Sequence, residues 1–404
     1  MTLKLDQLRA EFPALARRIS GRPLVYLDNA ATSLRPTRVL DAELDFYRQG
    51  GANVHRGKHA LSEEASEAFE SARESIADHL GAQSPREIVF VANATHGLNL
   101  VASGLRLSKE DEVIAAPVEH HSNLLPWMRA ASVKWVETEA LEPIRAEQVR
   151  ALISKRTRAI VIGHASNVTG VIQPVAEICQ VAREAGLVSV VDGAQSTPHL
   201  KIDVQQLGCD FFVFSGHKAL GPMGTGVLYG RSEQLERLEP LMLGGGTAEK
   251  VEVSGYRLRS PPQRLEAGTP NVAGAIALAE ALRFLKRLGF DEIAAHDARL
   301  AQALEDGLGP IRGLTLLMAK AAPRLPIASV LVGGLSIAPD ELSLMLSDRY
   351  AIMTRSGFHC AHPLFDRHGW IGGALRASCH VYNSVDEVEA LCYAARELAA
   401  AFGR

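Results

Sequence analysis

The sequence predicts an α/β fold in which a large domain, built on a mainly parallel β-sheet with helices on both faces, precedes a smaller α+β domain. Two observations lead to this prediction. Between about residues 85 and 230, short runs of β-branched and aromatic residues alternate with amphipathic stretches of helical periodicity. From about residue 276 the pattern changes to long helices with few strands. Alternation of strand and helix is typical of βαβ units, whose strands are parallel and whose helices cover the sheet.

Seven apolar runs in the first region are predicted to form the large sheet, because polar or turn-forming residues bound each of them. They are residues 87–93, 111–117, 133–138, 158–166, 188–195, 209–217 and 225–230. Two further runs, residues 326–334 and 374–381, are expected strands of the smaller domain.

The length of 404 residues favours two domains, since single hydrophobic cores stop growing beyond roughly 250–300 residues. We expect a large domain over residues 22–275 and a small domain over residues 276–404, to which the N-terminal segment 1–21 is added. Residues 240–275 are rich in Gly, Pro and charge, which predicts an exposed excursion with a role at an interface or a site.

The overall composition argues against several classes of partner. Hydrophobic residues make up 47% of the chain, charged residues make up 22%, and the net charge is −3. This balance argues against intrinsic disorder, nucleic-acid binding and attraction to an anionic membrane. No apolar run approaches the roughly 18 residues that span a bilayer, and charges are scattered through residues 1–15, unlike in a signal peptide. The sequence therefore predicts a cytoplasmic protein without a membrane partner.

Five cysteines are present, an odd number without a CxxC pair, which is a poor framework for disulfides or for zinc. Reduced thiols are therefore expected. Cys179, Cys209 and Cys392 lie in apolar helical or strand patterns and are predicted core residues, since free cysteine buries readily. Cys360 differs because residues 355–363 form a polar segment with Gly and Pro, which predicts a loop and a reachable thiol.

Two strand ends carry an acid and an amine. Asp192 ends one predicted strand and Lys218 follows the next, and their separation leaves room for one crossover, so both can face the same crevice. Pyridoxal phosphate (PLP) requires a lysine for its Schiff base and an acid beside its pyridine nitrogen. The alternative is that Asp192 only caps a helix and Lys218 is a solvated turn residue. The flanking glycines and the polar pair Ser215 and His217 favour the cofactor site.

Three other strand ends supply candidates. Thr95 starts a helical pattern, where free N–H groups favour a phosphate, and a plain N-cap is the alternative compatible role. His120 and His121 directly follow a strand, where one histidine can lie over a flat cofactor ring, and the pair does not settle which one is used. Asn167 is a candidate donor to a ring oxygen or an ordinary turn residue.

Nine motifs are distributed along nearly the whole chain: YLDNAATSLRP (26–36), NVHRGKHALS (53–62), EHHSN (119–123), SNVTG (166–170), VVDGAQ (190–195), FSGHKALGPMGTGVLYG (214–230), LEAGTPN (265–271), RSGFHCAHP (355–363) and LRASCHVYNS (375–384). In their order and approximate spacing these motifs resemble those of the fold-type I class V PLP enzymes, and within that class those of the cysteine desulfurases of the SufS type (group II).

The resemblance implies a role for each candidate. Lys218 would bind PLP as a Schiff base, Asp192 would pair with the pyridine nitrogen and His120 would stack on the ring. Cys360 would receive the sulfur of L-cysteine as a persulfide, for transfer to an acceptor protein in sulfur trafficking or iron–sulfur cluster assembly. The other implied contacts are Gln195 and Asn167 at the ring oxygen or the substrate, Thr95, Ser215 and His217 at the phosphate, Arg376 at the substrate carboxylate, and Arg355 and Arg56 as secondary contacts or surface ion pairs.

The resemblance further implies a homodimer with shared active sites, because Thr269 would reach the phosphate from a second subunit. Three departures from the family's usual pattern concern partner choice and rate. His96 stands where a glutamate is usual, GGGTAEKV (244–251) replaces a Gly-Gly-Glu-Met hairpin, and the cysteine loop reads FHCAHP where HHCAMP is usual. Arg355, with His359 when protonated, would favour the thiolate form of Cys360.

Other functions are compatible with the same residues. An aminotransferase, an epimerase, a selenocysteine lyase or another carbon–sulfur lyase would share the PLP site. A binding protein descended from such an enzyme would be expected to lack Lys218, which is present. NAD binding is not expected, because no GxGxxG motif follows a strand in the right place. No metal site is expected, since His359, Cys360 and His362 on one short loop do not complete a tetrahedral site.

Overall fold

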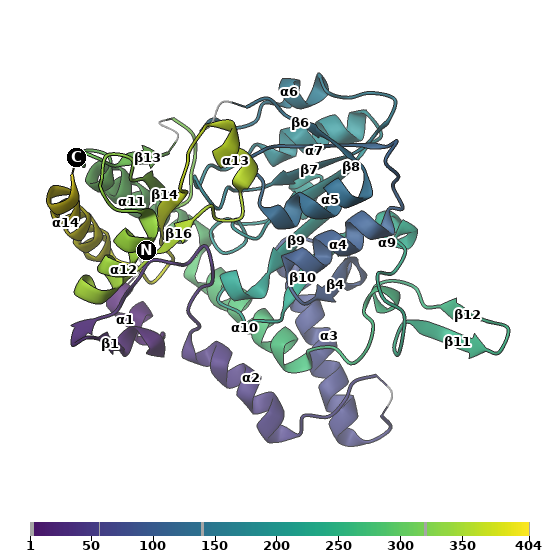
Figure 1. Ribbon diagram of the computed structural model, residues 1–404. Coiled ribbons are helices and arrows are strands. Elements are labelled where there is room, and N and C mark those ends of the chain that lie inside the picture. The colour runs from purple at the N-terminus through teal and green to yellow at the C-terminus, as the bar shows by residue number, and fades with distance from the viewer. Residues whose placement is uncertain (1–3, 56, 139–140, 319–320, 404) are drawn as a thin grey trace.

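The computed structural model describes residues 4–55, 57–138, 141–318 and 321–403. At its centre is a seven-stranded sheet in the order β4-β10-β9-β8-β7-β5-β6 (Figure 1). Its strands are β4 (Ile88–Val91), β5 (Glu112–Ala115), β6 (Ser132–Trp135), β7 (Thr157–Gly163), β8 (Val188–Asp192), β9 (Phe211–Ser215) and β10 (Gly226–Gly230). Each of the seven apolar runs forms one of these strands, as predicted.

The sheet is mainly parallel, as predicted, with one reversal near an edge. The pairings from β9 through β8, β7 and β5 to β6 are parallel, whereas β10 runs antiparallel to both β9 and β4. The connection between β9 and β10, residues 216–225, is too short for the crossover that a parallel pair needs. The parallel strands therefore present their carboxyl ends along one edge of the sheet, where ligands of such folds bind.

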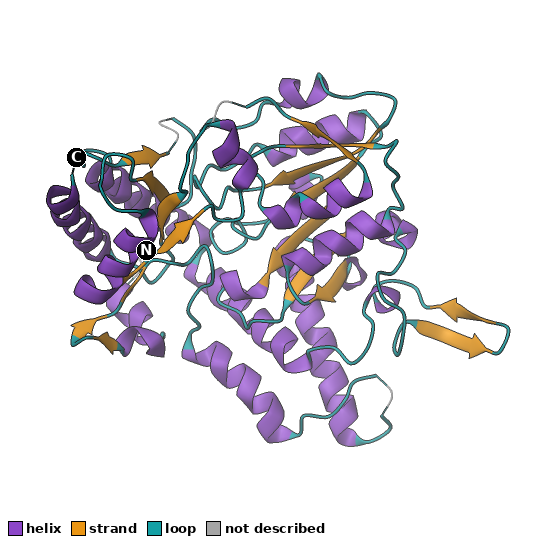
Figure 2. Ribbon diagram, viewed as in Figure 1, coloured by secondary structure: helices purple, strands orange, loops and turns teal. Residues whose placement is uncertain are grey.

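Helices cover both faces of this sheet (Figure 2). Alternate residues of β9 separate the two layers, because Phe211 and Val213 join one hydrophobic cluster while Phe212 and Phe214 join the other. The first cluster contains side chains of α4 (Ala94–Gly104), α5 (Leu125–Ala130) and α9 (Ser232–Arg237), and the second contains side chains of α2 (Thr37–Gln49), α3 (Ala60–Leu80), α7 (Val175–Glu184) and α10 (Val272–Leu288). The sheet is thus the middle of three layers.

A smaller antiparallel sheet forms a second hydrophobic core. Its order is β13-β14-β17-β16, with β13 (Thr315–Leu317), β14 (Ile327–Leu331), β17 (Ala374–Ser378) and β16 (Arg355–Gly357). The helices of this core are α11 (Phe290–Leu308), α12 (Pro339–Tyr350) and α14 (Val385–Phe402). The short helix α13 (His362–Arg367) directly follows the Cys360 segment.

We propose Gly289, the N-cap of α11, as the boundary between the two domains. The side chains of α10 pack into the core of the large sheet, whereas Leu300 and Leu304 of α11 pack into the smaller core. Leu8 and Phe12 of the N-terminal segment also belong to the large core. The division predicted from the sequence places the boundary after residue 275 and assigns segment 1–21 to the small domain, so the two divisions differ.

Several short elements complete the fold. The N-terminal strand β3 (Val25–Tyr26) pairs in parallel with β15 (Ile352–Met353), so the start of the chain lies against the small domain. The β11 (Ala248–Glu252) and β12 (Gly255–Leu258) hairpin projects from the body, in agreement with the predicted excursion (Figure 1). The remaining elements are α1 (Leu5–Ala10), α6 (Ala146–Arg150), α8 (Val204–Leu207), β1 (Arg18–Ile19), β2 (Arg22–Pro23) and the 3₁₀ turns η1 (Pro13–Ala16), η2 (Pro85–Glu87), η3 (His121–Asn123), η4 (Gly216–Lys218) and η5 (Gln263–Leu265).

Within the described ranges, none of the helices combines the length and the apolar character that a bilayer crossing requires.

A buried histidine–carboxylate pair joins the two domains. Nδ1 of His199, which follows β8, lies 2.7 Å from Oδ2 of Asp297 on α11. Both residues are 4% exposed, and the His199 ring also contacts the ring of His380. Loss of one partner of such a pair leaves the other polar group buried and unsatisfied, which costs more than the bond itself contributes.

Replacement of Asp297 by alanine is expected to lower the free energy of unfolding by about 3 kcal/mol, because His199 loses its buried partner. Chemical denaturation followed by circular dichroism measures this change. Asp306→Ala, at an exposed position of the same helix, is the matched control and should stay within about 0.5 kcal/mol of the wild type. Equal unfolding midpoints for the two variants would show that the His199–Asp297 pair does not stabilise the protein.

Candidate active site

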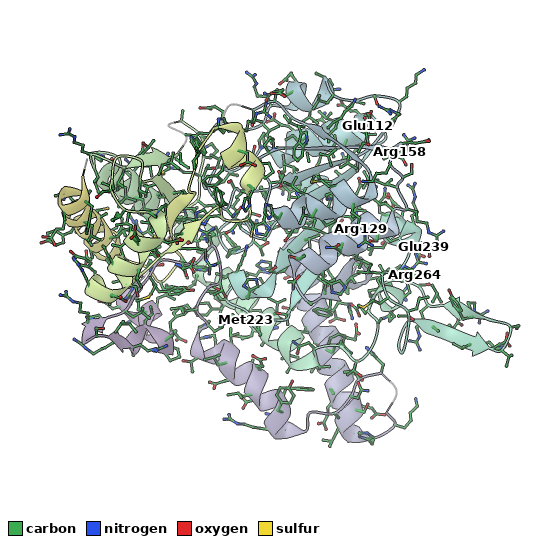
Figure 3. The ribbon with its side chains drawn as sticks, in the orientation of Figure 1. Glu112, Arg129, Arg158, Met223, Glu239 and Arg264 are labelled. Carbon is green, nitrogen blue, oxygen red and sulfur yellow. The ribbon has the colours of Figure 1, made fainter. Side chains whose placement is uncertain are left out.

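One large cavity lies where the carboxyl ends of the parallel strands meet the small domain. Its volume is about 590 Å³, a size typical of small-molecule sites. Met223, which is labelled in Figure 3, lines the cavity and is 65% exposed, so the cavity opens to solvent on this side. The lining includes eleven of the predicted site residues: Thr95, His120, Asn167, Asp192, Gln195, Ser215, His217, Lys218, Arg355, Cys360 and Arg376.

Neighbouring strands bring Asp192 and Lys218 to this cavity. Asp192 is the last residue of β8, and Lys218 ends η4, directly after the parallel neighbour β9. Oδ1 of the buried Asp192 accepts a hydrogen bond of 2.9 Å from the backbone N–H of Ala194. Burial raises the pKa of the Asp192 carboxyl. Burial also lowers the pKa of Lys218 to about 8, against the opposing attraction of Asp192.

Two of the histidines that line the cavity, His120 and His217, are neutral imidazoles at neutral pH. His120 precedes η3, and its Nδ1 accepts a hydrogen bond of 3.1 Å from the N–H of Ser122, so its proton lies on Nε2. Burial, with the charge of Lys218, lowers the pKa of His120 to about 3. Burial likewise lowers the pKa of His217 to about 4.

Hydroxyl groups and the N-terminus of α4 line one end of the cavity. The N-cap of α4 is Asn93, whose Oδ1 accepts from the N–H of His96 at 2.9 Å, so the alternative role of Thr95 as the N-cap is wrong. Thr95 Oγ1 instead lies 2.7 Å from Ser122 Oγ. Ser215 Oγ accepts from the N–H of Ala94 at 2.8 Å. Free N–H groups at a helix N-terminus, together with these hydroxyls, suit a phosphate group.

A buried arginine lines the cavity from the small domain. Arg376 on β17 is 2% exposed and donates from Nη1 to the backbone oxygen of Asn167 at 2.9 Å. Its Nη2 lies 3.4 Å from Oδ1 of Asp28, and its buried Nε has no hydrogen-bond partner among the described residues. Burial lowers the pKa of Arg376 to about 10, which leaves the guanidinium charged at neutral pH. A buried cation with a free donor is suited to an anionic ligand such as a carboxylate.

Arg355 lies beside Arg376 on the neighbouring strand β16. Its Nε and Nη2 donate to the two carboxylate oxygens of Asp28 at 3.0 to 3.2 Å. The hydrogen bonds to Asp28 raise the pKa of Arg355. Arg355 therefore lines the cavity and also forms the ion pair that was the alternative to a substrate contact.

The remaining cysteines, all within the described part of the chain, are buried, whereas Cys360 is exposed. His359 and Cys360 have φ angles of 50° and 56°, in the left-handed region. Nδ2 of Asn167 donates to the carbonyl of His359 at 2.7 Å, which fixes this backbone. Burial, with the charge of Arg376, lowers the pKa of His359 to about 3, so His359 is neutral at neutral pH and does not meet the condition under which it would favour the Cys360 thiolate.

One predicted site residue, Thr269, is not in this cavity. It is exposed and lines a separate cavity with Gly245, Gly246 and Arg259. The prediction for Arg56 falls outside the described residues.

Three further residues lie at the site although no local sequence pattern predicts a role for them. Asp28 pairs with both arginines, and Gln173 lines the cavity. Glu119 also lines it, and burial raises the pKa of this carboxyl to about 7. Asp28 and Glu119 lie in two of the nine motifs, YLDNAATSLRP and EHHSN. Their roles become visible only through burial or through contacts with residues remote in the chain.

The described residues contain no group of three or more His, Cys, Asp or Glu side chains that could hold a metal ion.

A match to a known protein family identifies the fold. The sequence pattern of the family described as Aminotransferase class-V matches residues 25–391. The chain belongs to the class-V aminotransferase family. Family membership and the solved structures below confirm the predicted fold class, a PLP-dependent transferase fold of type I.

Class-V aminotransferase relatives match along the whole chain. A probable cysteine desulfurase of Halalkalibacterium halodurans is 40% identical over 399 residues, which cover 96% of each chain. A cysteine desulfurase of Serratia proteamaculans is 38% identical over 400 residues, or 97% of each chain. The apo structure of a cysteine desulfurase from Thermococcus onnurineus NA1 has a TM-score of 0.91 and 37% identity over 98% of each chain. The Escherichia coli cysteine desulfurase CsdA, as the S-sulfonic acid, has a TM-score of 0.89 and 36% identity over 100% of each chain.

The cavity fits PLP, the cofactor of the class-V aminotransferase family. An amine with a lowered pKa and a buried carboxylate stand on adjacent strands, which matches the aldehyde and the pyridine nitrogen of PLP. The α4 N-terminus with Thr95 and Ser215 suits its phosphate. The unpartnered Nε of Arg376 leaves a donor for an amino-acid carboxylate.

In the cofactor-free protein, labelling of Lys218 by an amine-selective reagent should follow a titration with a midpoint of about pH 8. Only the neutral amine is nucleophilic, so the labelling rate should rise with pH through this value. Peptide mass spectrometry at a series of pH values measures it. Asp192→Asn removes the charge that raises the Lys218 pKa, so its midpoint should lie lower. A wild-type midpoint near 10.5, the ordinary value, would contradict the buried environment of Lys218.

Proposed function

We propose that this protein is a cysteine desulfurase of the SufS type (group II), which uses PLP to convert L-cysteine to L-alanine and leaves the sulfur on Cys360 as a persulfide. The observation that carries the proposal is the exposed thiol of Cys360 in the same cavity as Lys218, Asp192 and Arg376. An aminotransferase or an epimerase has no need of this thiol. The names of the relatives support the same reaction.

In this proposal the large domain holds the cofactor. Lys218 would bind it covalently, Asp192 would pair with its ring nitrogen, and His120 would lie against its ring. Thr95, Ser215 and His217 would hold the phosphate, while Gln195 and Asn167 would contact the ring oxygen or the substrate. Bound PLP supplies an electron sink for negative charge at the α-carbon of an amino acid.

Side chains of the protein then accept the α-proton of the substrate and bind its carboxylate. The Lys218 amine, with a pKa of about 8, is partly neutral near neutral pH and can accept the α-proton at Nζ. Arg376 binds the substrate carboxylate, and Arg355 provides a secondary contact. Because Arg376 is buried, its charge acts in an environment that water screens poorly.

The sulfur step takes place at Cys360. Its thiolate attacks the substrate sulfur, a sulfur–sulfur bond forms, and the carbon–sulfur bond of the substrate breaks. The electron pair of the broken bond stays on the β-carbon of the substrate, which takes up the proton that the Cys360 thiol released, and return of the α-proton from Lys218 Nζ to the α-carbon completes alanine. The persulfide on the exposed Cys360 is then accessible to an acceptor protein for sulfur trafficking or iron–sulfur cluster assembly.

We further propose a homodimer with shared active sites in the cytoplasm. Thr269 is exposed and lies outside the cavity of its own chain, which supports a contact with the cofactor phosphate of a second subunit. The buried pair Arg73 and Glu266 anchors the segment of Thr269, through two hydrogen bonds of 2.7 and 3.0 Å. The free cysteines support a reducing compartment.

Incubation with L-cysteine followed by alkylation should give a persulfide adduct on the peptide that contains Cys360, detected by mass spectrometry. In Cys360→Ala the adduct should disappear and alanine formation should fall by at least about 100-fold, because the nucleophile is lost. Cys392→Ala, in the core of α14, is the matched control and should keep both signals. Active wild-type enzyme without label on Cys360 would refute the proposed route.

Arg376→Lys is expected to raise KM for L-cysteine by roughly 10- to 100-fold, because lysine keeps the charge but cannot make a two-pronged contact with a carboxylate. Steady-state assays of alanine formation measure the change. Cysteamine, which lacks the carboxylate, serves as the control substrate for sulfur removal. If Arg376→Lys impaired cysteamine and cysteine turnover equally, Arg376 would not bind the substrate carboxylate.

A further inference from the structure

The loop that carries Cys360 is tied to the large domain by a pair of histidines. Nδ1 of His362, the first residue of α13, lies 3.2 Å from Nε2 of His121, and the backbone N–H of His362 points to the same nitrogen at 3.4 Å. The two rings stack with centroids 5.0 Å apart and an interplanar angle of 24°. His120, the residue before His121, lines the cavity. The contact between His121 and His362 therefore connects the cysteine loop to the cofactor side of the site.

A second ring stacks on His362. The Phe358 ring lies 4.5 Å from it, at an interplanar angle of 24°, and Phe358 also packs edge-to-face on Phe365 of α13. His362 thus contacts His121 and Phe358, which lie on different segments of the chain.

The loop between Phe358 and His362 has an unfavourable backbone conformation that contacts with other segments must stabilise. His359 and Cys360 are consecutive non-glycine residues in the left-handed region, which is unfavourable for residues with a β-carbon. The carbonyl of Cys360 accepts a hydrogen bond of 2.8 Å from the backbone N–H of His121. His121 therefore contacts the loop twice, through its backbone at Cys360 and through its side chain at His362.

The donor and the acceptor of this contact follow from its geometry. The backbone N–H of His362 donates to Nε2 of His121, so this nitrogen is an acceptor. The hydrogen bond between the rings then requires Nδ1 of His362 to be the donor. Burial and the nearby His362 lower the pKa of His121.

We propose that His362 is a positioning residue for Cys360. Its hydrogen bond to His121 holds the strained loop so that the Cys360 thiol stays at the cavity, where the sulfur of the substrate arrives. The inference rests on the proposed function, because only sulfur transfer gives this position of Cys360 a purpose. His362 itself takes no part in bond making.

Two substitutions separate the hydrogen bond from the ring stack. His362→Phe keeps an aromatic ring and removes the donor, whereas His362→Asn keeps a donor near the position of Nδ1 and removes the ring. His368→Phe is the matched control, because His368 stacks on Trp370 in the same region, outside the contact with His121. Unchanged absorbance of the bound cofactor would show that each variant keeps the site folded.

The first measurement is the rate at which iodoacetamide alkylates Cys360 without L-cysteine. We expect a several-fold increase in His362→Phe, a rate near that of the wild type in His362→Asn, and no change in His368→Phe. The second measurement is single-turnover alanine formation, which should slow several-fold in His362→Phe while KM for L-cysteine stays constant. The double variant His121→Phe/His362→Phe should differ from the wild type by no more than either single variant, since both remove the same bond.

Equal alkylation rates in His362→Phe and His368→Phe would overturn the proposal, and so would His362→Asn behaving as His362→Phe. The alkylation assay needs no substrate, so it separates the two hypotheses. A changed alkylation rate in an enzyme that forms no persulfide would refute the proposed function and leave the positioning role intact.

Discussion

The carboxylate of Asp28 holds together the parts of the chain that form the cavity. It directly follows the β3 region of the N-terminal segment and accepts hydrogen bonds from Arg355 and Arg376, which stand on neighbouring strands of the small sheet. A backbone bridge from Asp28 to Ser378 and a hydrogen bond of 2.7 Å from Asn29 Nδ2 to the Ser378 carbonyl extend this seam. The small domain is thereby placed so that its arginine and its cysteine loop face the strand ends of the large sheet.

Burial at the site sets the protonation states of its side chains. The same loss of water raises the pKa of the Asp192 and Glu119 carboxyls and lowers the pKa of Lys218, His120 and His359. The site consequently contains neutral imidazoles and an amine that can release or accept a proton near neutral pH. Few of these properties belong to the residue types themselves, because exposed histidine and lysine titrate at higher pH.

The fold alone does not distinguish the reactions of its family, because sites rather than folds determine chemistry. In the proposed function, the feature that distinguishes a desulfurase lies on the small domain, in the exposed Cys360, near the buried Arg376 that would bind the substrate carboxylate. The projecting β11–β12 hairpin and the segment of Thr269 lie apart from the cavity of their own chain, on elements that can contact another subunit (Figure 1). In the proposed function the large domain would hold the cofactor, and β17 with the Cys360 loop would bind the substrate.

The sequence by itself determined the strands and the residues at their ends. Alternation of apolar runs and helical patterns identified all seven strands of the large sheet, and the rule that parallel strands end at one edge brought Asp192 and Lys218 together. Only the tertiary structure decided that Asp28 binds both arginines, that His359 is neutral and that His362 contacts His121. These facts depend on distances between segments remote in the chain and on the exclusion of water, which no local pattern of residues encodes.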